Sequence, residues 1–450
     1  MSVDTAPVLP PATAPSARSA SEGRPPRWPH AANAVLGAWL AAAPATFGPH
    51  PPALLGSDII AGTLIVILSG LACTRRFPWA AWAVGLVGLW LMVAPLLFWA
   101  PTAAAYATDT LLGALVIAFA LLVPGTPGTR DLPGPDIPPG WSYNPSAWTQ
   151  RAGIITLAFI QFFIARHLAA YQLGHTASAW DPVFGDGTRR VLDSEVSRAF
   201  PVSDAGLGAV TYLIEALTGF LGGTRRWRTM PWAVLLFGVL VVPVGVVSLV
   251  LVILQPVAVG AWCSLCLVTA VLTVFMISPA VDEVVATGQF LLRVRREGRP
   301  VWRTFWRGGA GEVRPGETRP ADQKSLLREL AEGMELVTTP WNLAVCAALG
   351  VWLMAAPAVL GSGGAAADND RLVGALVATF AVIGFGEAAR SARLVNIVLG
   401  GWLLLAPWVV TGATPAARWN DLAVGGAVII LSVRRGRVES RFGSWDRSIV

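Results

Sequence analysis

The chain has 450 residues, of which 54% are apolar and 13% charged, and its formal net charge is +6. About a quarter of the residues in a soluble globular domain are charged, so this composition excludes an ordinary soluble protein. The charges lie between apolar stretches of roughly 17–25 residues, the length that crosses a bilayer. The excess arginine falls in short loops, which is typical of membrane topology and not of a nucleic-acid interface. We therefore expect an all-α polytopic membrane protein embedded in lipid, with no nucleic-acid partner.

Residues 1–30 are rich in Pro, Ala and Ser, and we expect a disordered tail there. A repeated motif, Gly-x-Trp-Leu-x-x-Ala-Pro, begins directly after this tail. It occurs four times, starting at Gly37, Gly88, Gly350 and Gly400. About 14 residues after each Pro comes an Asp, and four residues later a Gly. The four acidic residues are Asp58, Asp109, Asp370 and Asp421.

Each repeat predicts a hairpin of two membrane-spanning helices. The Pro should end the first helix, the Asp should cap the start of the second, and the following Gly should let neighbouring helices approach closely. We find no ionisable residues paired along these helices, so a lipid-embedded scaffold is favoured over a transport role. The four copies resemble the SPW-repeat family of bacterial membrane proteins over two blocks, 31–125 and 340–434. The resemblance implies architecture and no known chemistry.

A different unit, 151–280, lies between the two blocks, joined to them by a linker (126–150) and a charged connector (281–339). We expect four spans in it, forming a central four-helix bundle flanked by the hairpins. A polar segment, 174–204, separates the first two spans, and a basic loop, 224–228, separates the second and third. The expected spans are 152–173, 205–221, 232–254, and a fourth that starts with a cysteine pair and ends near Pro279.

The arginines predict the orientation, because positively charged loops stay in the cytoplasm. Arg225, Arg226 and Arg228 place the basic loop inside, so the polar segment and the cysteine pair fall on the outer face. About 12 spans result, with both termini cytoplasmic, including the tail 435–450. Within the connector we expect a helix over 321–336. Abundant Ala, Gly and Arg with almost no Lys is typical of a GC-rich bacterial genome, which indicates the bacterial inner membrane.

The segment Trp262-Cys263-Ser264-Leu265-Cys266 carries the clearest chemical signal in the chain. Residues three apart share one face of a helix, close enough for a disulfide. The unpaired N–H groups and dipole at a helix start stabilise a thiolate. A redox-active pair is thus one interpretation; inert packing and a metal site, which would need more ligands, are the others. We expect Cys73 and Cys346 to be small buried hydrophobic residues.

The order of span, polar outer loop, span, basic loop, span and Cys-x-x-Cys span resembles the vitamin K epoxide reductase family. The segments Phe200–Gly208, with Tyr212 after it, and Val191–Ser197 resemble the family's entry to its second helix. The resemblance implies a membrane thiol/disulfide oxidoreductase whose helix-borne pair reduces a quinone, either ubiquinone or menaquinone, without a metal. Carried over, Cys266 would face the quinone and Cys263 would exchange with a thiol donor.

Two departures from the family pattern stand out. Members usually carry a second cysteine pair in the outer loop, but 174–204 has none, and Asp193 or Ser194 stands about where one of them would be. Ala270 occupies the place of an aromatic hydroxyl one turn after the pair. Either a separate thioredoxin-like donor meets Cys263 at the outer face, or the protein is a non-catalytic membrane scaffold or redox sensor.

Four further residues are candidate quinone contacts. Asp204 matches a polar position at the family's pocket mouth, although it could equally cap the second span. Tyr212 and Glu215 lie deeper on that span. Glu215 is either a proton source for the quinol or a solvated residue near the cytoplasmic end. Trp262 either walls the pocket or anchors its helix at the membrane interface.

Overall fold

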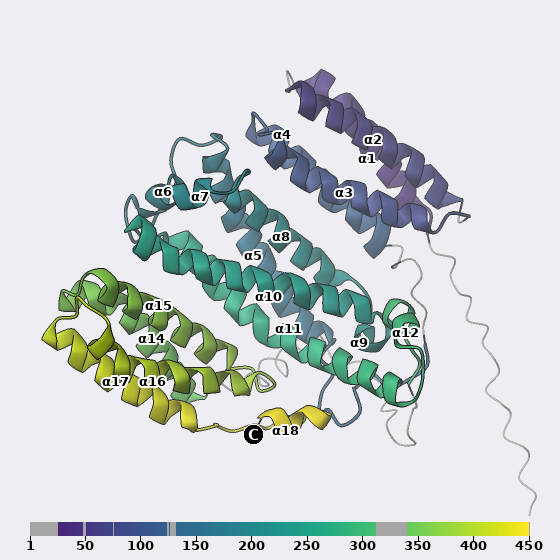
Figure 1. Ribbon diagram of the computed structural model, residues 1–450. Coiled ribbons are helices and arrows are strands. Elements are labelled where there is room, and N and C mark those ends of the chain that lie inside the picture. Colours follow the sequence, from purple (N-terminus) through teal and green to yellow (C-terminus); the bar gives the residue numbers. More distant parts are fainter. Residues whose placement is uncertain are drawn as a thin grey trace, which may run out of the picture.

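The computed structural model describes residues 26–47, 51–74, 76–123, 126, 132–311 and 340–449. Its described residues form helices and turns and no strand, apart from an isolated bridge between Trp141 and Phe442. Figure 1 shows three groups of roughly parallel helices, with a central bundle between two flanking blocks. The predicted all-α architecture is confirmed. The helix expected over 321–336 and most of the expected tail, 1–30, lie outside the described residues.

The two flanking blocks have the same design, two helical hairpins side by side. The N-terminal block consists of α1 (Trp28–Phe47), α2 (Pro52–Cys73), α3 (Trp79–Leu97) and α4 (Ala103–Ile117), which a π-helical turn η1 (Ala118–Leu122) extends. The C-terminal block consists of α14 (Trp341–Leu360), α15 (Gly364–Ile383), η3 (Arg390–Ala392), α16 (Arg393–Val409) and α17 (Pro415–Val433).

Paired glycines hold the two helices of each hairpin together. A Cβ added to the first glycine of each motif would lie only 2.6–2.9 Å from the carbonyl oxygen of a glycine on the second helix. The predicted close approach is confirmed, and only glycine permits it. The pairs are Gly37 with Gly62, Gly88 with Gly113, Gly350 with Gly374, and Gly400 with Gly425.

The predicted roles of the motif Pro and Asp residues are wrong in detail. Each first helix continues two or three residues beyond its Pro, as α3 does from Pro95 to Leu97. The acidic residues lie buried inside the second helices, well past the start, and the side chains that cap α4 and α17 are Thr102 and Thr414. A short hydroxyl side chain placed just before the first turn takes the cap in these two helices.

The buried acidic residues also meet across each block. Asp58 and Asp109 interact electrostatically, as do Asp370 and Asp421. The expectation that no ionisable residues pair along the repeat helices is therefore wrong. The pairing escaped detection because each partner comes from a different hairpin, about fifty residues apart in the sequence.

The central bundle contains the four expected helices, and their packing is antiparallel (Figure 1). They are α5 (Trp148–Gln172), α8 (Asp204–Phe220), α10 (Pro231–Leu254), which the π-helical turn η2 (Gln255–Val259) extends, and α11 (Ser264–Arg296). Shorter helices join or follow them: α6 (Gly187–Leu192), α7 (Glu195–Arg198), α9 (Arg226–Thr229) and α12 (Val301–Arg307). Near the C-terminus lie η4 (Gly443–Trp445) and α18 (Asp446–Ile449).

Helix α11 does not end near Pro279 as predicted. It runs on through Pro279 to Arg296 and so takes up the first part of the expected connector. A proline inside a helix costs one hydrogen bond and bends the chain, but packing on both sides can keep the helix continuous. Here α5 on one side and α15 on the other pack along α11.

Nine helices in the described part of the chain are long and apolar enough to cross a membrane. Helices α1, α8 and α15 are not among them, although each is the partner of a spanning helix in a hairpin or in the bundle. Helix α8 has only 17 residues, and α15 carries three charged residues near its start. A polytopic membrane protein is confirmed, whereas the total of about 12 spans stays a prediction.

The predicted basic loop forms one sealed end of the central bundle, called the arginine end below. Arg226 forms a buried bidentate ion pair with Glu283, with N–O distances of 2.6 Å. The guanidinium of Arg228 donates to backbone carbonyls of residues 132–135, and that of Arg151 to carbonyls of residues 219–223. These arginines therefore hold the loops of the arginine end together, in addition to any influence on membrane topology.

Candidate functional site

The opposite end of the bundle, called the cysteine end, holds a disulfide between Cys263 and Cys266. The turn η2 ends at Gly260, which adopts a left-handed conformation with φ of +67° and so lets the chain reverse. Cys263 is then extended, and α11 begins at Ser264 with Cys263 as its N-cap. The Cα atoms of the two cysteines are 5.3 Å apart, as their spacing on one helix face predicts.

Cys263 is completely buried, with 0% of its surface exposed. Its backbone N–H donates to the Gln255 side-chain oxygen at 2.9 Å, and its sulfur accepts the N–H of Cys266 at 3.1 Å. An N–H group at a helix start favours negative charge on the atom that it contacts. Of the two sulfurs, the buried one is therefore held where a thiolate would be stabilised.

Cys266 lines a cavity of about 290 Å³ between α5, α8, α10 and α11, with α6 and α7 of the outer loop at its mouth. Three of the residues singled out from the sequence line it: Cys266, Asp204 and Tyr212. Most other lining residues are apolar, such as Phe200 and Val244, so the cavity suits a flat apolar molecule with a few polar atoms.

Polar groups gather at the inner wall of this cavity. Tyr212, Ser248 and Thr269 line it together. Behind them the buried Gln161 amide donates to the Thr269 carbonyl at 2.9 Å and to the Thr273 hydroxyl at 2.6 Å. These hydrogen bonds hold Thr269 and Thr273 in place next to Tyr212, whose hydroxyl could donate to a bound carbonyl oxygen.

The alternative reading of Asp204 as the cap of α8 is wrong. The cap is Ser203, whose hydroxyl accepts the N–H of Gly206 at 2.9 Å. Asp204 is the first helical residue, and its carboxylate accepts hydrogen bonds from the side chains of Gln172 and Ser197. It therefore ties the end of α5 and the outer loop to α8 while also lining the cavity.

The remaining two candidates lie outside this cavity. Glu215 is 1% exposed, and neither carboxylate oxygen has a hydrogen-bond partner among the described residues. The alternative that it is solvated is therefore wrong. Trp262 lines a neighbouring cavity and packs at 6.4 Å, between ring centroids, from Phe184. The structure thus brings together three of the candidates, with Cys263 directly behind them.

The outer loop between α5 and α8 is attached to the cysteine end by Asp181, which the sequence did not single out. Its carboxylate accepts the side chain and the N–H of Ser264, the side chain and N–H of Thr188, and the N–H groups of Val183 and Phe184. Burial alone would raise the pKa of Asp181, but these hydrogen bonds together hold it well below its usual range.

Close packing completes this cover. A Cβ added to Gly187, at the start of α6, would lie 2.0 Å from the carbonyl oxygen of Trp262, so only glycine fits there. On the far side of the loop the His175 ring contacts the carbonyl oxygen of Ala100, in the N-terminal block, at 2.7 Å. The loop therefore covers Cys263 and is held at several points, without any cysteine of its own.

Other residues discussed from the sequence take structural positions. Asp193 accepts a hydrogen bond from Tyr171 and pairs with Arg198, while Ser194 caps α7 and lines the first cavity. Cys346 is buried as expected, whereas Cys73 is only half-buried. In the described part of the chain, no three His, Cys, Asp or Glu side chains gather in a way that would hold a metal ion.

Sequence reasoning missed Asp181, Gln255, Ser248 and Thr269 as site residues. Asp181 had a weak signal, since an Asp followed by Pro commonly starts a hydrogen-bonded turn. Gln255 also had one, because it opens the short turn before the cysteine pair. Nothing local marks Ser248 or Thr269, whose places depend on how α10 and α11 pack.

Comparison with family models identifies residues 153–280 as a vitamin K epoxide reductase family domain. Residues 27–123 and 340–435 match the SPW repeat domain. No curated protein matches the chain. No solved structure matches it either. The chain therefore carries one domain of the reductase family between two SPW repeat domains, as predicted, and the former indicates a membrane thiol oxidoreductase.

Proposed function

We propose that this protein is a quinone-linked thiol/disulfide oxidoreductase that acts through Cys263 and Cys266. The observation that carries the proposal is the pair's position: Cys266 faces a largely apolar cavity between four helices, while Cys263 caps a helix on the opposite side of the disulfide. The family match supports the same class of reaction. The substrates would be protein thiols on one side and ubiquinone or menaquinone on the other.

In the first half-reaction a partner dithiol reduces the Cys263–Cys266 disulfide. A thiolate of the partner attacks the Cys263 sulfur, the S–S bond breaks, and Cys266 leaves as a thiolate. The partner's second thiol then attacks the mixed disulfide, which releases Cys263 and leaves the partner oxidised. The Cys266 N–H that contacts the Cys263 sulfur would stabilise the thiolate formed there.

In the second half-reaction the two thiols give two electrons and two protons to the quinone, which leaves as quinol while the disulfide re-forms. We assign Cys266 as the sulfur next to the quinone ring, with Tyr212 and Asp204 as polar contacts in the cavity. Glu215 interacts electrostatically with Tyr212 and is our candidate proton source behind it. Each of these roles belongs to the proposal.

The first half-reaction requires the outer loop to move, because Cys263 has no exposed surface. We propose that a separate thioredoxin-like donor gains access when the contacts of Asp181 with Ser264 open. This donor would replace the loop cysteines that family members usually carry. The cysteine end would then face outward from a bacterial inner membrane, with both chain termini in the cytoplasm.

The proposal is tested by quinone reduction with purified protein and a dithiol donor. Cys266→Ala should abolish turnover, because the remaining thiol cannot form the internal disulfide. Cys346→Ala, which removes a buried cysteine in the C-terminal block, is the matched control and should keep full activity. If Cys266→Ala retains activity, the proposal fails.

Two observations favour a second candidate function. The complete burial of Cys263 and the absence of loop cysteines suit a structural disulfide within a non-catalytic scaffold or redox sensor. In that case the native protein would not reduce any quinone, whereas opening of the disulfide would lower its thermal stability.

A further inference from the structure

A second cavity, of about 550 Å³, lies between the central bundle and the C-terminal block. Helices α10 and α11 form one wall, and α14 and α15 form the other. Its lining is almost entirely apolar, and the side chains contributed by the C-terminal block are mostly small. Five of them are alanines: Ala347, Ala348, Ala355, Ala375 and Ala378.

The two bodies touch at both ends of this interface. At the cysteine end the Arg371 guanidinium donates to the carbonyl oxygen of Pro256 at 3.3 Å. At the arginine end the Ser278 hydroxyl donates to the carbonyl oxygen of Ile383 at 3.0 Å. Between these contacts the small side chains leave space. Because three of the wall helices, α10, α11 and α14, are long and apolar enough to cross a membrane, a hydrocarbon chain is the chemistry that fits this space.

The second cavity borders the first. Ser248 and Val252 on α10 line both of them. On α11, Cys266 lines the first cavity, while Leu267 and Ala270 line the second. If the ring of a bound molecule lies beside Cys266, the apolar second cavity begins within one turn of α11 from it. Ala270 lies at this point, where a larger side chain would fill part of the space.

We propose that the second cavity binds the isoprenoid tail of the quinone whose ring reacts at Cys266. This inference rests on the proposed function and adds the C-terminal block as part of the substrate site. Phe184 and Trp262 line the cavity where it meets the cysteine end. The head group of a bound phospholipid would have to occupy the space that these two rings take up. A tail that continues from the neighbouring ring site needs no head group there.

The test compares binding of menaquinone, which has an isoprenoid tail, with binding of menadione, which has the same ring and no tail. The variant Ala347→Phe fills the second cavity from α14 without touching the first. Ala344→Phe, on the exposed surface of the same helix and outside the cavity lining, is the matched control. Binding is measured on protein in nanodiscs, so the result does not depend on turnover.

Ala347→Phe should weaken menaquinone binding about tenfold or more, since it displaces about two buried methylene groups of the tail. Menadione binding should stay unchanged, and Ala344→Phe should alter neither. A second variant, Val351→Trp, fills the same cavity and should act like the first. A menaquinone carrying a photoreactive group at the end of its tail should label α14 or α15.

Equal binding of menaquinone by Ala347→Phe, Val351→Trp and the native chain would overturn the inference, even if the enzyme reduces quinones. Loss of a co-purified phospholipid from these variants, without any change in menaquinone binding, would overturn it too and would assign the cavity to lipid. Failure of the proposed function is a different result: the native chain would bind both quinones without reducing either.

Discussion

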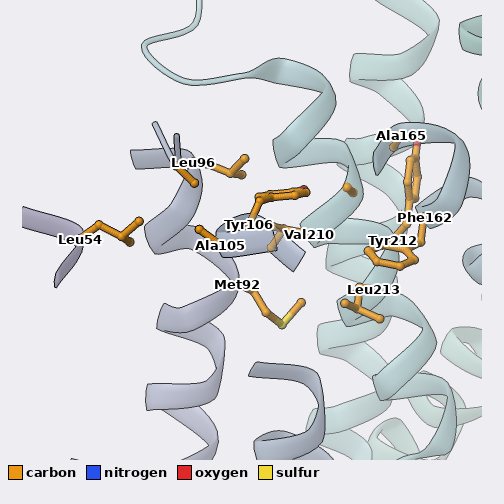
Figure 2. Packing of buried hydrophobic residues seen from close by; sticks show 12 residues of the cluster. Leu54, Met92, Leu96, Ala105, Tyr106, Phe162, Ala165, Val210, Tyr212 and Leu213 are labelled. Carbon is orange, nitrogen blue, oxygen red and sulfur yellow. The ribbon is translucent and has the colours of Figure 1, made fainter. Parts of the chain in front are cut away.

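The two repeat blocks share one design, yet they contact the central bundle in opposite ways. The N-terminal block inserts large side chains, Met92, Leu96 and Tyr106, against Val210 and Leu213 of α8, and Figure 2 shows them converging on the bundle. The C-terminal block presents alanines and leaves a cavity. The same repeat design can thus pack tightly against the bundle in one block and leave a cavity in the other, depending on a few outward side chains.

Within each block the construction is the same. The glycine pairs recur four times. Motif tryptophans also donate hydrogen bonds to polar side chains of the other hairpin in the same block. Trp352 donates to Asn420 at 2.8 Å, Trp402 to Asn369 at 2.7 Å, and Trp90 to Ser57 at 2.9 Å. The difference between the blocks is therefore confined to the faces that meet the bundle, and substitutions on those faces test it.

The interface of the central bundle with the N-terminal block is called the sealed side below, and that with the C-terminal block the open side. The largest expected effect comes from removing a large side chain from the sealed side. Tyr106→Ala would leave a void among buried side chains and should lower the free energy of unfolding by about 3–5 kcal/mol. The matched change on the open side, Val351→Ala, removes atoms that already border a cavity and should cost less than about 1 kcal/mol. Unfolding titrations in mixed micelles measure both. Equal losses would contradict the contrast between the two sides.

Overfilling the sealed side should have the next largest effect. A Cβ added to Gly206 would lie 2.4 Å from the Leu96 side chain, so Gly206→Ala should destabilise the protein by about 1–3 kcal/mol. The clash is with the end of a flexible leucine, which places the expected value in the lower half of that range. The double variant Gly206→Ala with Leu96→Ala should lose less stability than the sum of the two single changes, because the clash is then absent; additive losses would show that the two residues do not meet.

The outer loop gives a third prediction, because Asp181 holds Phe184 at the end of the open side. Asp181→Asn removes hydrogen bonds to a charged group, each contributing about 1.5–3 kcal/mol. In reduced protein, alkylation of Cys263 should then be about tenfold faster or more. Asp186→Asn, an exposed change in the same loop, is the control and should leave the rate as it is.

The same carboxylate predicts a pH dependence. The folded-state pKa of Asp181 lies below that of the unfolded chain, so its stabilising effect is complete above about pH 4. It should be lost as the pH falls from there toward the lower folded-state value. Hydrogen-exchange protection of the loop amides should decrease over that range in the native chain and be independent of pH in Asp181→Asn. Unchanged protection in the native chain would mean that other contacts hold the loop.

The smallest expected effect is a gain on the open side. Ala347→Val adds the equivalent of two methylene groups to the second cavity, whose burial gains about 1.6 kcal/mol. The lower helix propensity of Val offsets about 0.6 kcal/mol of this, so the quinone-free protein should be stabilised by up to about 1 kcal/mol. Its thermal midpoint should be equal to or slightly above that of the native chain. A clear decrease would show that the interface is already full there.

Much of this architecture was predictable, because the signals were local. The motif glycines identified the hairpins, and Cys263 and Cys266 identified the disulfide segment within a four-helix unit. The prediction that Asp residues cap the second helices failed because a cap depends on which residue precedes the first turn, and Thr102 and Thr414 take that place. Local pattern alone did not distinguish a buried Asp from a cap.

The missing parts of the site depend on long-range packing. Asp181 contacts Ser264, which is 83 residues away in the sequence. Ser248 lines both cavities because α10 contributes to the wall of each. One interpretation of the sequence placed Trp262 at the wall of the quinone pocket, the other at the membrane interface; its side chain lines the second cavity. No pattern within one helix reveals which of its faces meets which neighbour, so these assignments required the fold.

The most direct test of the central claim is the redox state of Cys263 and Cys266 in native membranes, measured by differential alkylation before and after quinone is added to reduced protein. Quinone should convert the pair from two thiols to a disulfide, while Cys73 and Cys346 should not change. If the pair stays reduced in the presence of quinone, the disulfide is structural and the proposed function is contradicted.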